Sequence, residues 1–251
     1  VKLYPAGATT NSNAGVTELG NVFSIFERMQ EAGMPLLVHG EITDPEVDVF
    51  DREAVYIDRV LSSIVSNFPE LKVVMEHITT KDAVDFVRAR AAEAPGRIGA
   101  TITAHHLVIN RTDIFRGGIR PHLYCLPIAK REFHRLALRE AATSGDAPFF
   151  LGTDTAPHVK FAKETSCGCA GIFTAPTALE IYTQVFDEES ALDKLEAFAS
   201  LNGPAFYGLE VNEAKVKLHR TDTICPETVY TLDGDLLHVF GGGETLAWQV
   251  T

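Results

Sequence analysis

The sequence predicts an α/β fold in which a parallel sheet alternates with crossover helices. Short β-rich runs alternate with longer segments of helical period, and no Gly/Ser-rich linker divides the chain. With 251 residues, 45% of them hydrophobic, the chain is long enough for one sizeable core. We therefore expect a single domain over residues 1–251, with about 210–251 as a C-terminal extension. The expected strands are Val1–Tyr4, Pro35–His39, Lys72–His77, Ile98–Thr103 and Pro148–Thr153.

The segments between these strands carry apolar residues at helical spacing. In the first crossover the spaced residues are Leu19, Val22, Phe23, Phe26 and Met29, and in the second they are Ile57, Val60, Leu61, Ile64 and Phe68. A third helix is expected from Thr79 or Thr80, which are good N-cap types, to just before Pro95. A fourth runs from about Lys130 to Ser144, with Phe133, Leu136, Ala137 and Ala141 turned inward. Further helices are expected around Ala178–Phe186 and Ala191–Ser200, before the Gly/Pro-punctuated stretch Asn202-Gly203-Pro204.

Charge and composition exclude several classes of partner. The chain has 22 Lys plus Arg against 34 Asp plus Glu, a net charge of −12, so a surface that follows nucleic-acid phosphates has no electrostatic basis. The apolar runs are strand-sized and far short of the roughly 20 residues that a membrane-spanning helix needs. The four cysteines form no CxxC pair, which is typical of a protein of the reducing cytoplasm.

Metal-binding residue types stand at the ends of several expected strands. His39 follows Leu36-Leu37-Val38, His77 follows the run that starts at Val73, and Asp154 follows Phe149-Phe150-Leu151-Gly152-Thr153. The intervals from Lys2 to His39, His39 to His77 and His77 to Asp154 are 37, 38 and 77 residues, or one, one and two βα units. Such residues converge on one face of a barrel and resemble a Zn²⁺ site with N and O ligands. Spacing alone leaves open a structural role for each residue, and an open doubly wound sheet in place of a barrel.

Several longer stretches carry a resemblance to a known family. They are Lys2–Ala6 with Ala8–Ser12, Pro35–Glu41, Glu76–Asp82, Arg120–Pro127, Leu151–Asp154, Ala156–His158 and Ser166–Gly171. In these stretches the chain resembles the bacterial-type (class II) dihydroorotases of the amidohydrolase superfamily. The resemblance extends from residue 1 to about 208. It implies a (β/α)8 TIM barrel of the metal-dependent hydrolase type, of which only about the last five βα units are present.

The resemblance also implies a site and a reaction. Two Zn²⁺ ions per subunit would be bridged by N6-carboxylated Lys2, with His39 and His77 as ligands of one of them. A hydroxide between the metals would attack the cyclic amide, with Asp154 as metal ligand and as acid/base, in the reversible interconversion of N-carbamoyl-L-aspartate and (S)-dihydroorotate of pyrimidine (UMP) biosynthesis. A homodimer is implied as well. The residues that match substrate-contacting positions are Leu126 and Ala170 through the backbone, His158 at the substrate carboxylate, and Thr9 and Thr10 at the tip of a closing loop.

The chain departs from the family pattern at its beginning. No His-x-His occurs in the 251 residues, although the family uses such a pair for the other metal. The chain opens at Val1 directly in an expected strand, and five strands are found where a barrel has eight. We therefore expect an N-terminal truncation just before Lys2, and a fragment that is poorly stable and inactive by itself.

Two other functions stay open on the sequence alone. One is a different cyclic amidohydrolase, such as a hydantoinase or dihydropyrimidinase, against which the Arg120–Pro127 and Ser166–Gly171 stretches argue. The other is a catalytically silent barrel used as an assembly partner, which the joint presence of the four strand-end residues disfavours. Cys167-Gly168-Cys169 is interpreted as a tight loop, and His105-His106 as residues outside the ligand set, either supporting it or on the surface.

Overall fold

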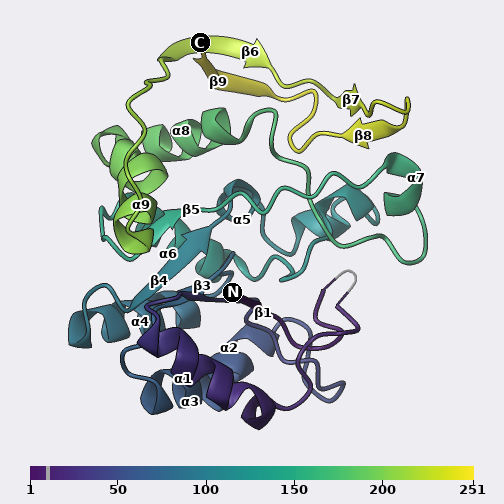
Figure 1. Ribbon diagram of the computed structural model, residues 1–251. Helices are drawn as coiled ribbons and strands as arrows, with labels where there is room; N and C mark the ends of the chain where they lie inside the picture. Colours follow the sequence, from purple (N-terminus) through teal and green to yellow (C-terminus); the bar gives the residue numbers. More distant parts are fainter. Residues whose placement is uncertain (10–11) are drawn as a thin grey trace.

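A computed structural model describes residues 1–9 and 12–251 and contains a five-stranded parallel sheet. Its strands follow chain order, and each pairs in parallel with the next (Figure 1). All five predicted strands are confirmed, each one to three residues shorter than expected. Their bounds are β1 Lys2–Leu3, β2 Leu36–Val38, β3 Val73–Met75, β4 Ile98–Ile102 and β5 Phe149–Leu151.

Helices fill the crossovers between the strands. In Figure 1 helices α1 to α3 lie below the sheet, whereas α8 and the C-terminal strands lie above it. Thr80 is the N-cap of α4, because its hydroxyl accepts a hydrogen bond from the Ala83 N–H at 3.1 Å, as the sequence predicts. The helical segments up to the fifth strand are η1 Leu19–Val22, α1 Phe23–Glu31, α2 Arg52–Tyr56, η2 Ile57–Leu61, α3 Ser62–Asn67, α4 Lys81–Glu93, α5 Ala104–Val108, η3 Asp113–Phe115, η4 Pro121–Leu123 and α6 Glu132–Thr143. Those after it are α7 Lys160–Lys163, α8 Ala178–Glu188, η5 Leu192–Lys194, η6 Ala197–Leu201 and α9 Asn202–Tyr207.

The two faces of the sheet differ in what covers them. Successive side chains of a strand point to opposite faces of the sheet. Leu36, Val38, Val73 and Met75 therefore join the main core, whereas Leu37 and Val74 point to the other face. On that second face a small cluster forms from Val74, Phe150 and Phe206, with Leu37 and Tyr207 packed against it. Helix α9 supplies the rings of Phe206 and Tyr207, and strand β5 supplies that of Phe150. Lys2 and Glu76 lie on the same face.

Two features of the helices correct the sequence prediction. Phe133 and Leu136 of α6 are 53% and 50% exposed, so the expectation that they turn inward is wrong. Ala141 is buried as predicted, and the buried face of α6 runs through Leu138, Ala141 and Ala142. The Asn202-Gly203-Pro204 stretch forms the first turn of α9, which continues directly from the π-helical turn η6.

Two antiparallel pairs complete the fold after residue 217. Strand β6 (Leu218–Ile224) pairs with β9 (Thr245–Val250), and β7 (Thr228–Tyr230) pairs with β8 (Leu236–His238). The β6/β9 pair packs on α8, where Asp187 accepts from the Trp248 indole N–H at 3.2 Å and forms an ion pair with Arg220 at 2.6 Å. No helix of the described residues combines the length and the apolar character that a membrane span requires.

Candidate active site

Parallel pairing brings four of the predicted site residues to one region of the sheet. Lys2 lies in β1, while His39, His77 and Asp154 follow β2, β3 and β5 by one to three residues. The strand ends are level, since Leu3 pairs with Val38 and Val38 with Met75. The His39 N–H donates to the Leu3 carbonyl at 2.9 Å, which continues the ladder by one residue.

The two histidines of this region are buried and adjacent. The imidazole centroids of His39 and His77 lie 4.8 Å apart, and the residues are 1% and 3% exposed. The Nε2 atom of His39 lies 2.8 Å from the carboxylate of buried Glu41, a pairing that fixes the ring and leaves Nδ1 for another contact. Such a carboxylate behind a histidine is typical of metal-ligating imidazoles.

His77 has the properties of a ligand that is kept neutral. Burial holds the pKa of His77 well below its usual value, and the positive charges of His39, Lys2 and His106 lower it further. Its Nδ1 atom is buried and has no hydrogen-bond partner among the described residues. A neutral imidazole with a free buried nitrogen fits a metal ion, because only the unprotonated nitrogen can bind one.

Lys2 is paired with a carboxylate that the sequence analysis missed. Its Nζ atom lies 2.5 Å from Oε2 of Glu76, with side chains 39% and 19% exposed. Glu76 directly precedes His77, and the alternation of β3 places it on the face of Lys2. That alternation is the signal that could have identified it. An ammonium held by a carboxylate is a poor nucleophile toward CO₂, so carboxylation of Lys2 requires this ion pair to open.

Asp154 lies near the same charges. Partial burial raises the pKa of Asp154, the positive charges of Lys2 and His39 lower it, and Glu76 raises it. Both Asp154 and His77 have left-handed backbone conformations, with φ of 42° and 46°. Non-glycine residues held in this region are strained and cluster at functional sites.

The backbone turn after β3 is held from two sides. Thr101 accepts from the His77 N–H at 2.7 Å. Gly152, after β5, lies so close to the Thr101 side chain that a Cβ there would be 2.5 Å from the Thr101 Cβ. On the other side Glu53, 1% exposed, accepts from the backbone N–H and hydroxyl groups of both Thr79 and Thr80, at 2.5–3.0 Å. Burial raises the pKa of Glu53, while Lys130 and the two threonines lower it. Glu53 was not found from the sequence, since it lies 24 residues before His77 on another element.

The residues predicted to contact substrate lie in two loops that are tied together. His158 Nε2 is 3.1 Å from the Ala170 carbonyl, and the Gly171 N–H donates to the Tyr124 carbonyl at 3.0 Å, two residues before Leu126. Thr9 lies in a short turn with Ser12, whose hydroxyl donates to the Thr9 carbonyl at 2.5 Å. Thr10 lies outside the described residues.

Lys163 is the connection between these loops and was also missed by the sequence analysis. It is 2% exposed, and its Nζ atom donates to the carbonyls of Tyr124, Cys169 and Gly171 at 2.8, 2.6 and 2.8 Å. Burial lowers the pKa of Lys163 to about 8, which the neighbouring Cys125 and Cys169 partly oppose.

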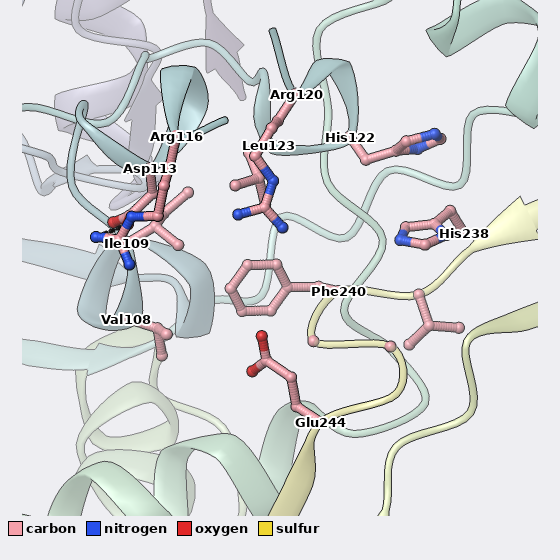
Figure 2. Close-up of a pocket in the computed structure, with 13 residues that line it drawn as sticks. Val108, Ile109, Asp113, Arg116, Arg120, His122, Leu123, His238, Phe240 and Glu244 are labelled. Carbon is pink, nitrogen blue, oxygen red and sulfur yellow. Dashed lines mark ion pairs between the residues drawn. The ribbon is translucent and has the colours of Figure 1, made fainter. Parts of the chain in front are cut away.

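A cavity of about 350 Å³ lies apart from these residues, between α5, the η3–η4 segment and the C-terminal strands. Figure 2 shows the side chains of Arg120 and Glu244 directed toward the ring of Phe240 from opposite sides. None of the predicted site residues lines this cavity.

His105 and His106 are buried, at 1% and 3% exposed, so a surface location for them is wrong. With Cys125 they form the only group of three or more His, Cys, Asp or Glu residues in the described chain whose ligand atoms lie within 4.8 Å of one another.

Comparison with known proteins decides the family. No protein-family model matches the chain. A dihydroorotase of Hahella chejuensis is 57% identical over 248 residues, covering 99% of this chain and 70% of that protein. A dihydroorotase of Cupriavidus necator is 59% identical over 249 residues, covering 99% and 71%. The chain belongs to the dihydroorotase family. It is therefore related to enzymes that hydrolyse cyclic amides, as its sequence motifs predict.

Solved structures agree with this membership and with the barrel. A Saccharomyces cerevisiae dihydroorotase in complex with 5-fluoroorotic acid superposes with a TM-score of 0.92 at 33% identity, covering all of this chain and 72% of that one. A Campylobacter jejuni dihydroorotase gives 0.88 at 36% identity, covering 100% and 70%. A D-hydantoinase of Thermus sp. shares the fold at a TM-score of 0.76 and 15% identity. The five parallel strands are thus part of an amidohydrolase (β/α)8 barrel, as predicted.

Proposed function

We propose that this chain carries the metal-binding and proton-transfer residues of a zinc-dependent dihydroorotase, which interconverts N-carbamoyl-L-aspartate and (S)-dihydroorotate in pyrimidine biosynthesis. The observation that carries the proposal is the convergence of Lys2, His39, His77 and Asp154 at one end of the sheet. Family membership supports the reaction class, and the neutral, partly unpartnered His77 supports a metal ion.

In this proposal the four residues would hold zinc, with Lys2 in its carboxylated form bridging two ions. Bound zinc would polarise the amide carbonyl and lower the pKa of a water to about 7. Asp154 accepts a proton from the attacking water at its carboxylate and passes it to the ring nitrogen that leaves. Glu41 keeps the His39 ring in place, and Glu53 keeps the turn that follows His77.

The substrate would lie against the two loops that Lys163 joins. His158 faces the substrate carboxylate, while backbone groups of Leu126 and Ala170 contact the ring. Thr9 belongs to a loop that excludes water when it closes. The donor set is incomplete without a His-x-His pair, so we propose that the 251 residues by themselves bind metal and ligand but do not turn over substrate.

Calorimetry with the zinc-loaded chain tests the substrate class. We expect dihydroorotate to bind at least about tenfold more tightly than dihydrouracil, which lacks the carboxylate, because a site with a polar partner left unpaired rejects such an analogue. The preference should disappear in His158→Ala. Equal binding of both compounds by the unsubstituted chain would favour a dihydropyrimidinase. Absence of stoichiometric zinc, by elemental analysis, would favour a silent barrel.

The same proposal includes a cytoplasmic homodimer with 1–251 as one barrel domain and about 210–251 as its extension. All four cysteines are free, which supports a reducing compartment. Sedimentation equilibrium over a range of concentrations tests the dimer, and a single monomeric species at all of them contradicts it.

A further inference from the structure

Three metal-ligating side chains that the proposed function does not use meet at the end of β4. His105 and His106 lie in α5, directly after that strand, and Cys125 lies in the loop after η4. The three residues are 1%, 3% and 2% exposed, and their ligand atoms all lie within 4.8 Å of one another. Buried groups of this kind normally have hydrogen-bond partners.

His105 has no polar partner among the described residues. Both of its ring nitrogens are buried without a hydrogen bond, while its ring packs 4.4 Å from the His106 ring and 6.2 Å from the Phe240 ring, centroid to centroid. A buried imidazole with two unsatisfied nitrogens is costly in a folded protein. A ligand that uses one of these nitrogens would remove part of that cost.

His106 and Cys125 are already spaced as metal ligands. The Nε2 atom of His106 lies 3.5 Å from the Cys125 Sγ atom. Ligands at the usual Zn–N and Zn–S distances and a tetrahedral angle are separated by about 3.6 Å. Behind the ring, the Thr103 hydroxyl lies 2.8 Å from His106 Nδ1 and can accept a proton there, so a shift of the ring proton from Nε2 to Nδ1 would free the Nε2 lone pair for a cation. The Pro127 carbonyl oxygen accepts from His106 Nε2–H at 3.0 Å and from the Cys125 S–H at 3.3 Å, and it would become available as a fourth metal ligand once both protons have moved.

We propose that His105, His106 and Cys125 form a second metal site, which binds one divalent ion of the Zn²⁺ type. A donor set of two imidazoles and a thiolate binds zinc in preference to the hard cations magnesium and calcium. On binding, the Cys125 S–H bond breaks, an Sγ–metal bond forms and one proton leaves to solvent. The single ring proton of His106 moves from Nε2 to Nδ1, where the Thr103 hydroxyl accepts it, and His105 contributes one neutral nitrogen.

A metal ion at this site would also hold the loop that carries Leu126. Cys125 and Pro127 flank Leu126, so an ion held by the thiolate and the carbonyl would fix the backbone that we propose to contact substrate. This consequence rests on the proposed function, whereas the metal site does not. Phe240, which packs on His105, also lines the 350 Å³ cavity of Figure 2, so its ring separates the site from that opening.

Titration of the 251-residue chain with Co²⁺ tests the site by a signal that the other metal residues cannot give. Thiolate-to-cobalt charge-transfer absorption requires a sulfur ligand, and Lys2, His39, His77 and Asp154 contain none. The titration uses a Cys167→Ser/Cys169→Ser background to remove the two cysteines that are not buried. We expect the absorption to appear in the background, to saturate at one equivalent in Lys2→Ala/His77→Ala, and to vanish in Cys125→Ser. Absorption that is absent from the background, or that survives Cys125→Ser, overturns the proposal.

Two milder variants keep the test decisive where Cys125→Ser does not fold. His105→Gln removes a ligand whose nitrogens have no partner in the described chain, and it should lower the Co²⁺ affinity at least tenfold. Thr103→Val, which keeps the shape of the side chain, should lower it about 10–100-fold, as for other partners behind a ligand. Cys225→Ser is the matched control, since this buried thiol lies outside the cluster, and it should bind as the background does. An unchanged affinity in His105→Gln contradicts the site, and loss of zinc only from Lys2→Ala/His77→Ala concerns the proposed function alone.

Discussion

The Nζ atom of Lys163 donates a hydrogen bond to the Gly171 carbonyl at 2.8 Å, inside a loop eight residues further along the chain. The same nitrogen reaches the carbonyls of Cys169 and Tyr124, so one buried side chain connects the segments that carry Ala170 and Leu126. Backbone carbonyls in irregular loops have no ladder to satisfy them. Lys163 is therefore the common hydrogen-bond donor to two loops that are not connected by strand pairing.

Replacement of this lysine by methionine removes the donor and keeps the stem. Lys163→Met should lower the free energy of unfolding by at least about 1.5–3 kcal/mol, because hydrogen bonds from a charged group are lost and carbonyls stay buried. Urea unfolding followed by circular dichroism measures the change. Lys160→Met is the control on the same helix, since Lys160 is exposed and lies 3.8 Å from Glu164. Equal effects of the two substitutions would show that the loops do not depend on Lys163.

A second prediction concerns Glu53 below the turn that follows His77. Glu53→Gln should lower the free energy of unfolding by about 1–3 kcal/mol, because an amide N–H₂ would face N–H and O–H donors of Thr79 and Thr80. Zinc affinity at the strand-end residues should fall with it, since the turn positions His77. Calorimetric zinc titration of the variant measures this effect. Glu46→Gln, an exposed carboxylate outside the site, should change neither quantity, and full zinc affinity in Glu53→Gln would contradict the positioning role.

Acid stability should depend on Glu132 at the start of α6. Hydrogen bonds from Arg135 and Asn110 lower the pKa of Glu132 to about 2, below its ordinary value of 4.5 in an unfolded chain. A depressed carboxyl pKa stabilises the fold above pH 4.5, and this contribution is lost as the pH falls from 4.5 toward 2. Glu132→Gln should therefore show a flatter decline of the unfolding free energy over that window. The side chain is 48% exposed, so the difference is small and should shrink further at high salt. Parallel curves for Glu132→Gln and the unsubstituted chain would contradict the assignment.

The orientation of α6 can be tested with two substitutions on its opposite faces. Phe133→Lys, at a site 53% exposed, should change the unfolding free energy by no more than about 0.5 kcal/mol. Leu138→Ala, at a site 1% exposed, should lower it by about 2–5 kcal/mol. A large loss in Phe133→Lys would mean that another surface covers this face.

The sequence sufficed for the strands because each is an apolar run followed by a polar residue, and such runs are legible without tertiary information. It also placed His39, His77 and Asp154, since those residues stand at the strand ends. It failed at Phe133 and Leu136 because helical spacing shows a stripe but not which of two overlapping stripes meets the core. It missed Glu53 and Lys163 because their partners are backbone groups on other elements, and backbone groups leave no mark in the sequence.

The wide separation of the site residues along the chain has a consequence for synthesis. Lys2 and Asp154 are 152 positions apart, and each strand that carries a site residue is followed by its own helix. At a translation rate of about 5–20 residues per second, Asp154 leaves the ribosome about 8–30 seconds after Lys2. During that interval the Lys2 ammonium, its partner Glu76 and the two histidines exist without the last carboxylate. The site can therefore assemble only after β5 has been synthesised, and its assembly depends on long-range strand pairing, which is slow.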